Sequence, residues 1–135
     1  MRLVVDSNIL FSALIKDSFT RRLIFHIDAE LLTIAFSHKE IMKYKLQIIK
    51  KSNMPEEKLE EIFKQLKDRL ITIDENLFSN KMKQANEIMG AIDPNDTPFI
   101  AAALATGADI WSDDKHFEQQ NKVKVWKTKD LIQFL

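Results

Sequence analysis

The residues best suited to chemistry in this sequence are acids that lie beside short apolar runs. Asp6 directly follows Leu-Val-Val, and Asp113 with Asp114 follows Ala-Asp-Ile-Trp-Ser. Asp93 and Asp96 lie in Ile-Asp-Pro-Asn-Asp, at the start of a helical pattern. Carboxylates that converge repel one another unless a cation lies between them. A ligand set made of oxygen atoms suits Mg²⁺ or Mn²⁺, and we see no neighbouring histidine or cysteine that would favour zinc.

Each acid taken alone has an ordinary structural explanation. Asp6 could start a turn, Asp96 could be a helix N-cap, and Glu40, in the first turn of a predicted helix, could compensate the helix dipole. Their common position is what favours chemistry. In a parallel sheet the carboxyl ends of all strands meet at one edge, and neighbouring strands are only ~4.8 Å apart. The acids are therefore expected to crowd together at that edge.

The elements that must position these acids are short apolar strands separated by helices. The predicted strands cover residues 3–5, 31–36, 70–73, 108–111 and 123–126. Their near-continuous apolar character is typical of strands that are covered on both faces. We expect a three-layer α/β/α sandwich with a central parallel sheet of about five strands.

The helices are predicted from apolar spacing and from stop signals. Residues 56–70 carry apolar side chains at i, i+3 and i+4, as in an amphipathic helix. Residues 96–106 form a second helix, which begins at Asp96 or Thr97 and stops at Gly107. The segment from Lys50 to Glu57 is the best turn in the middle of the chain, and it predicts a helical hairpin between strands two and three.

Composition bounds the class of protein. The chain has 135 residues, a net charge of zero and 45% hydrophobic residues, which predicts one soluble domain over residues 1–135. It has no cysteine and only two glycines; this excludes disulfide frameworks, Gly-x-Gly dinucleotide loops and P-loops. Asp6 interrupts the apolar amino terminus, and no apolar run approaches the ~20 residues of a membrane span, so we expect no membrane association and a cytoplasmic location.

Four segments together resemble the PIN domain family, over essentially the whole chain. They are VVDSNILFSAL at the amino terminus, KEIMKYKLQIIKKS around Glu40, IDPNDTPFIAAAL, and IWSDDKHF near the end. The resemblance is strongest to the subgroup that has a helical hairpin after the second strand. It implies a metal-dependent endoribonuclease whose acidic quartet is Asp6, Glu40, Asp96 and Asp114.

The resemblance also implies supporting roles for the neighbours of these acids. Asn8 and Ser112 match positions that orient the acids or their waters, and Asp113 falls where the family often has asparagine. Asp93 matches a further acid of the subgroup, and contact of Asp93 or Asp113 with metal stays open. The segment before Glu40 lacks a proline that is often found there, which leaves the turn carrying Glu40 open as well.

In the implied mechanism, a metal ion held by Asp6, Asp96 and Asp114 lowers the pKa of a water that attacks the phosphate, and a second ion could lie near Glu40. The implied substrate is single-stranded RNA, with Lys115 as the side chain best placed to contact it. Other basic groups are read first as solvated faces: Lys39, Lys43, Lys45, Lys50 and Lys51, Arg21 and Arg22, and Lys122, Lys124, Lys127 and Lys129. The three histidines are read as surface or packing residues, and Trp111 and Trp126, which lie in predicted strands, are both read as core.

Two other functions are weighed against the nuclease. Asp6, Asp74, Ser112 and Lys127 imitate the phosphoacceptor arrangement of a response-regulator receiver domain, although that arrangement leaves Asp96, Asp113 and Asp114 unused. A PIN fold retained only as a binding module is the other. Many compact PIN proteins resemble VapC-type toxins, which implies a homodimer and a small antitoxin as partners. These settings follow from resemblance alone.

Overall fold

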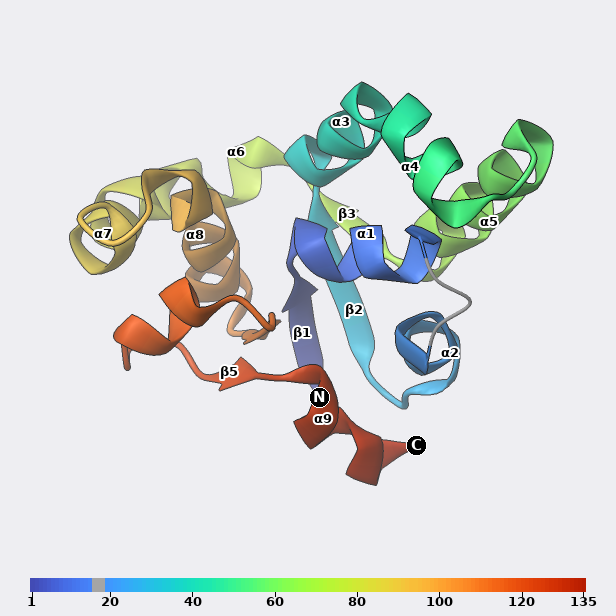
Figure 1. Ribbon diagram of the computed structural model, residues 1–135. Helices are drawn as coiled ribbons and strands as arrows, with labels where there is room; N and C mark the ends of the chain where they lie inside the picture. The colour runs from blue at the N-terminus through green and yellow to red at the C-terminus, as the bar shows by residue number, and fades with distance from the viewer. Residues whose placement is uncertain (16–18) are drawn as a thin grey trace.

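The computed structural model describes residues 1–15 and 19–135, and it contains a five-stranded parallel sheet. The strand order is β3-β2-β1-β4-β5, so β1 lies at the centre of the sheet (Figure 1). The strands are β1 (Arg2–Val5), β2 (Glu30–Ile34), β3 (Ile71–Ile73), β4 (Asp109–Trp111) and β5 (Val125–Trp126). The predicted α/β/α architecture with about five parallel strands is confirmed.

Two predicted strand ends were each wrong by two residues. The second strand ends at Ile34, and Phe36 already belongs to the next helix with 44% of its surface exposed. The fifth strand begins at Val125, because Gln120 holds Val123 in the preceding loop: its side chain accepts from the Val123 amide and donates to the Val123 carbonyl, both at 2.9 Å. Apolar residues at these positions are buried or half-exposed without pairing in the sheet, which hydrophobicity alone does not reveal.

One face of the sheet is covered by the helices that connect β1 to β2 and β2 to β3. Leu3, Val5 and Leu31 of the sheet belong to the core on this side. The helices after β1 are α1 (Ser7–Ile15) and α2 (Phe19–His26), and those after β2 are α3 (Ala35–Lys43), α4 (Lys45–Ser52) and α5 (Glu56–Arg69). Helices α4 and α5 form the predicted hairpin, with Asn53 in the left-handed conformation (φ 56°) at the end of α4.

The opposite face is covered by the helices between β3 and β4, which Figure 1 shows on the other side of the sheet. Val4, Leu32 and Ile110 of the sheet belong to this second core. The helices are α6 (Glu75–Phe78), η1 (Ser79–Lys81), α7 (Met82–Met89), η2 (Pro94–Asp96) and α8 (Thr97–Thr106). Helix α8 stops at Gly107, whose φ of 67° favours glycine. The chain ends with η3 (Lys115–Gln119), α9 (Thr128–Leu131) and η4 (Ile132–Phe134).

The strand order reverses at β1: β2 and β3 follow on one side of it, and β4 and β5 lie on the other. The connections after β1 and β2 cover one face, whereas the connection into β4 covers the other. Strands β1 and β4 are neighbours in the sheet, so their carboxyl ends flank the switch point at which open α/β sheets bind ligands.

This topology contradicts the receiver interpretation. A receiver sheet has the order 2-1-3-4-5, which makes the first and third strands neighbours. Here β3 lies at the edge of the sheet, separated from β1 by β2. Asp74 instead caps α6 by accepting a hydrogen bond from the Asn76 amide at 3.1 Å, and Lys127 is paired with Glu118.

Candidate metal centre

Asp6 is a buried acid at the end of the central strand. Its residue surface is only 3% exposed, and its amide donates to the carbonyl of Trp111 at 3.0 Å, which continues the pairing of β1 with β4. The carboxylate accepts hydrogen bonds from the backbone amides of Ser7 and Asn8 at the start of α1. The Ser112 hydroxyl donates to Asp6 Oδ2 at 2.8 Å. Asp6 is thus held in place from both strands.

Asp114 and Asp113 are adjacent acids with different surroundings. Asp114 Oδ1 accepts from the His116 amide at 2.9 Å, and the Asp114 amide donates to Ser112 Oγ at 3.0 Å. Asp113 is exposed, and its two oxygens accept from the amide and the hydroxyl of Thr128 at 2.8 and 2.6 Å. Asp114 faces Asp6 and Asp96. Asp113 instead connects the end of β4 to the start of α9.

Asp96 and Asp93 come from the segment that leads into α8. Asp93 Oδ1 accepts from the Asn95 amide at 3.0 Å and so caps the short helix η2. Asp96 is 8% exposed, and its Oδ2 atom is buried without a hydrogen-bond partner. Its predicted N-cap bond is not formed, so capping does not explain why an acid is buried here.

Electrostatics couple four of these acids: Asp6, Asp93, Asp96 and Asp114. Burial, together with the charge of Asp114, raises the pKa of Asp6 to about 6, although the Ser112 hydrogen bond lowers it. Burial raises the pKa of Asp96 to about 7, helped by the charges of Asp6, Asp93 and Asp114 and opposed by His116. Mutual repulsion of this kind is relieved by a cation.

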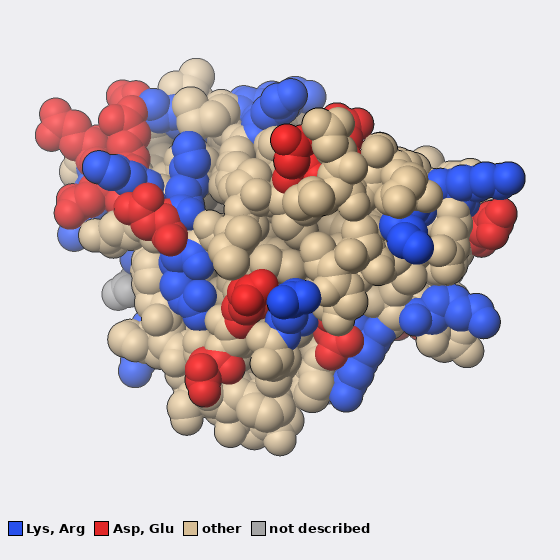
Figure 2. Space-filling view, turned by 180° about the vertical axis from the view of Figure 1, so that it is seen from behind, with Lys and Arg blue, Asp and Glu red and all other residues tan. Residues whose placement is uncertain are grey.

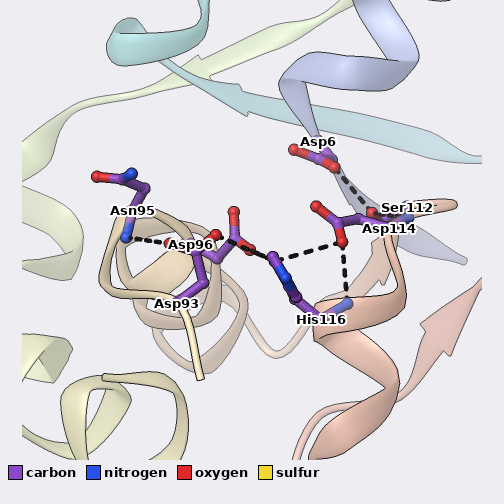
Figure 3. Close-up of polar contacts among 7 residues, drawn as sticks. All are labelled: Asp6, Asp93, Asn95, Asp96, Ser112, Asp114 and His116. Atoms are coloured by element: carbon purple, nitrogen blue, oxygen red, sulfur yellow. Dashed lines mark hydrogen bonds and ion pairs between the residues drawn. The ribbon is translucent and has the colours of Figure 1, made fainter. Parts of the chain in front are cut away.

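His116 lies among the acids of this cluster, which consists of Asp6, Asp93, Asp96 and Asp114. This position was not predicted from the sequence. Figure 3 shows the ring between Asp93 and Asp96 on one side and Asp114 on the other. Its Nδ1 atom is 3.1 Å from Asp93 Oδ2, 3.7 Å from Asp96 Oδ2 and 3.5 Å from Asp114 Oδ1. The argument that no histidine is near the acids was therefore wrong. The His116 side chain is 45% exposed, as expected of a surface residue, but its Nδ1 atom faces the acids. A histidine two residues after a candidate ligand was the available signal.

The charges of the four coupled acids are not among the causes that shift the pKa of Glu40. Glu40 is in the second turn of α3, not in the first turn as predicted, because the helix begins earlier, at Ala35. Glu40 is partly buried, which raises its pKa, while Lys43 and hydrogen bonding with Ser7 lower it. Ser7 Oγ also lies 2.9 Å from Ser37 Oγ, within hydrogen-bond distance. Glu40 is thus connected to the residue next to Asp6, on the β2 side of the site.

The remaining predicted residues lie on the surface around the cluster. The side chain of Asn8 borders a shallow pocket between α1 and α4 with Phe11 and Tyr44, and Lys115 is exposed at the start of η3. Acidic and basic side chains are interspersed over the face in Figure 2, with no continuous basic surface on that side. Lys45 contacts Glu56 and Glu60, which fits its interpretation as part of a solvated face.

The packing interpretation holds for His38, and the core prediction holds for Trp111 but not fully for Trp126, which packs against the core without being buried in it. His38 contacts the Thr72 hydroxyl at 2.9 Å. Trp111 is fully buried, whereas Trp126 is only partly buried and donates to Asp109 Oδ2 at 2.9 Å.

The donor set fits a divalent metal ion. Ligand atoms of Asp93, Asp96 and His116 all lie within 4.8 Å of one another. The unpartnered Asp96 oxygen and the raised pKa values of Asp6 and Asp96 are what a site built for a cation shows without one. Carboxylate oxygens suit Mg²⁺ and Mn²⁺, and one imidazole suits Mn²⁺ better than Mg²⁺.

The parallel α/β/α fold, with its acidic centre at the carboxyl ends of the strands, can be compared with known protein families. The model of the PIN domain family matches residues 4–135. The chain belongs to the PIN domain family.

Among solved structures, the chain is similar to one in the crystal structure of VapBC2 from Rickettsia felis bound to a DNA fragment from their promoter. The TM-score is 0.63 at 17% identity, over 94% of this chain and 98% of that chain. At such low identity the likeness supports a shared fold. No match was found among curated proteins. Among the helices that the structure describes, none is long and apolar enough to cross a membrane.

Proposed function

We propose that residues 1–135 form one nuclease domain that hydrolyses RNA phosphodiester bonds with Mg²⁺ or Mn²⁺ as the cofactor. One observation carries the proposal: Asp6, Asp96 and Asp114 come from three separate segments, yet they meet at one place. Ser112 is hydrogen-bonded to Asp6 and to the Asp114 amide, and His116 Nδ1 lies within 3.7 Å of both Asp96 and Asp114. Repulsion between coupled carboxylates lowers the stability of the folded protein. Such perturbed acids are concentrated at functional sites. Membership of the PIN domain family supports the same reading.

In this proposal Asp6, Asp96 and Asp114 hold the metal, and Glu40 would assist a second ion. When bound, a divalent ion lowers the pKa of water and neutralises charge on the phosphate. The chain's own residues supply the arrangement. Ser112 fixes Asp6 by donating to it and fixes Asp114 by accepting from its amide.

Two neighbours complete the proposed site. Lys115, which is exposed beside Asp114, would bind a phosphate of single-stranded RNA. Asp93, whose Oδ1 atom accepts a hydrogen bond from the Asn95 amide, would add a further carboxylate beside Asp96.

We propose further that the protein acts as the toxin of a toxin–antitoxin pair in the cytoplasm. The VapBC2 structure supports this by fold, and a groove of about 350 Å³ offers a docking surface for an antitoxin. Its apolar walls come from α1 and from the helices α3 to α5: Leu14, Ile41, Met42, Ile48, Leu59 and Phe63. Exposed apolar side chains elsewhere, among them Leu77 at 63% and Ile71 at 52%, support pairing as a homodimer. Light scattering of the purified protein tests the dimer.

The test of the proposed activity is cleavage of a single-stranded RNA in Mn²⁺ by three proteins. Wild type should cut, and Asp96→Asn should lose activity by several orders of magnitude because it removes a ligand and the most strongly perturbed acid. Asp74→Asn is the matched control, since Asp74 caps α6 at the far edge of the sheet, and it should cut like wild type.

The contrary results point to other functions. Equal cleavage by wild type and Asp96→Asn would place the activity elsewhere or in a contaminant. Tight RNA binding by wild type with no cleavage in any divalent metal would favour the binding-module alternative.

A further inference from the structure

The cluster contains a nitrogen atom in an unusual setting. His116 Nδ1 is buried and makes no hydrogen bond, although three carboxylate oxygens lie within 3.1 to 3.7 Å of it. A buried polar atom without a hydrogen bond lowers the stability of the folded protein, and such atoms in native proteins usually have a ligand or water as partner. Asp96 Oδ2, which faces the same space, is also buried and unpartnered.

Two roles could explain an imidazole here. A protonated ring would act as an internal cation that pairs with the acids, whereas a neutral ring would offer its Nδ1 lone pair to a metal. An internal cation should donate a well-directed hydrogen bond to its closest carboxylate, Asp93. The contact is close, at 3.1 Å, yet Nδ1 makes no hydrogen bond. The direction of the ring therefore favours the ligand role.

The separations of the donor atoms agree with shared ligation. Ligands at right angles around an ion with bonds of ~2.1 Å lie about 3.0 Å apart, and tetrahedral ligands about 3.4 Å. His116 Nδ1 is 3.1 Å from Asp93 Oδ2 and 3.7 Å from Asp96 Oδ2. Small movements would bring these three donors to one ion.

We propose that His116 Nδ1 is a metal ligand beside Asp93 and Asp96, and that this nitrogen makes the centre selective for Mn²⁺ over Mg²⁺. The inference rests on the proposed function, because it concerns the same metal-binding edge of the sheet. Mg²⁺ takes oxygen ligands and keeps several waters, whereas imidazole binds transition metals. Asp96 would be a ligand in both proposed sets: the set with Asp93 and His116, and the set with Asp6 and Asp114.

Pulsed electron paramagnetic resonance of the Mn²⁺-loaded protein tests the ligand directly. Wild type should show coupling of the Mn²⁺ spin to a nitrogen, and labelling the histidines with ¹⁵N should change that coupling. The coupling should be lost in His116→Gln and kept in His26→Gln, since His26 is exposed at the end of α2. The wild-type spectra need no variant to fold, and thermal melts check that both variants do.

Titrations with Mn²⁺ and Mg²⁺ test the selectivity. His116→Gln should lower the Mn²⁺ affinity about 10-fold or more, by analogy with losses of metal-site residues, and should leave the Mg²⁺ affinity within about twofold. A Mn²⁺ spectrum without nitrogen coupling, or an unchanged or higher Mn²⁺ affinity in His116→Gln, would overturn the proposal and identify His116 as an internal cation.

The outcome is separable from that of the proposed function. RNA cleavage by wild type together with absent nitrogen coupling would sink only the ligand role of His116. Nitrogen coupling without any cleavage would support the ligand role while removing the nuclease.

Discussion

The hydroxyl of Ser112 donates to Asp6 Oδ2 at 2.8 Å and joins the carboxyl ends of β4 and β1. Ser112 Oγ also accepts a hydrogen bond from the Asp114 amide at 3.0 Å. A single fully buried side chain therefore orients two candidate ligands. It also opposes the effect of burial on Asp6 by lowering the pKa of that carboxyl.

Ser112→Ala should weaken the site without removing a ligand. Hydrogen bonds to charged groups contribute about 1.5–3 kcal/mol, so we expect the Mn²⁺ affinity to fall roughly 10-fold or more and the metal-free protein to lose about 1 kcal/mol of stability. Calorimetric titration measures the affinity, with the exposed Ser79→Ala as control. Unchanged affinity in Ser112→Ala would show that the serine only packs.

Asp6→Asn should stabilise the metal-free protein while removing its response to metal. Burial and the Asp114 charge both disfavour the ionised form of Asp6, so neutralising it should raise the melting temperature in chelator by a few degrees, since ~1 kcal/mol corresponds to roughly 3–6 °C here. Wild type should gain ~2.7 kcal/mol at a Mn²⁺ concentration 100 times the dissociation constant. A mutant less stable in chelator, yet equally stabilised by Mn²⁺, would make Asp6 a structural turn residue.

The stability of the metal-free protein should depend on pH through Asp96. Its pKa rises from 3.8 to about 7 on folding, so the folded state binds more protons between these values. The free energy of unfolding therefore falls as pH rises from about 4 to 7. Asp96→Asn cannot titrate, so its advantage over wild type should be small near pH 4.5 and largest at pH 8. Denaturant melts in chelator measure this difference, and a constant or decreasing advantage would refute the coupling.

The adjacent acids Asp113 and Asp114 should separate in their effects. Asp114→Asn should reduce the Mn²⁺ affinity at least 10-fold, because Asp114 faces Asp6, Asp96 and His116. Asp113→Asn should stay within about twofold, because both oxygens of Asp113 are used on Thr128. Removing those bonds altogether in Asp113→Ala should cost about 1 kcal/mol of stability, as for a lost helix cap. Equal affinity losses in the two asparagine variants would contradict this division.

The fold was largely predictable because strand, helix and turn signals lie in the local sequence. The amphipathic spacing of residues 56–70 and the stop at Gly107 correspond to α5 and the end of α8. The end of β2 was not predictable in this way. Phe36 is apolar but half-exposed at the start of α3, and hydrophobicity does not distinguish a strand residue from an apolar residue on a helix surface.

The candidate site was predictable in part, for a related reason. Parallel strands bring their ends together, which placed Asp6 and Asp114 correctly at one edge. Sequence spacing could not show which of two adjacent acids turns inward, nor that the ring of His116 folds back over Asp93. These directions depend on the short helix η3 and on the hydrogen bond between Asp113 and Thr128, which are 15 residues apart in the sequence.

Asp6, Asp96 and Asp114 are proposed to share one divalent ion. Anomalous diffraction from crystals soaked in Mn²⁺ tests it most directly, because the metal is located independently of any assay. We predict an anomalous peak bonded to carboxylate oxygens of these three residues, and its loss in Asp96→Asn crystals. No anomalous peak at these residues at saturating Mn²⁺, or a peak confined to acids elsewhere on the surface, would contradict metal binding by Asp6, Asp96 and Asp114.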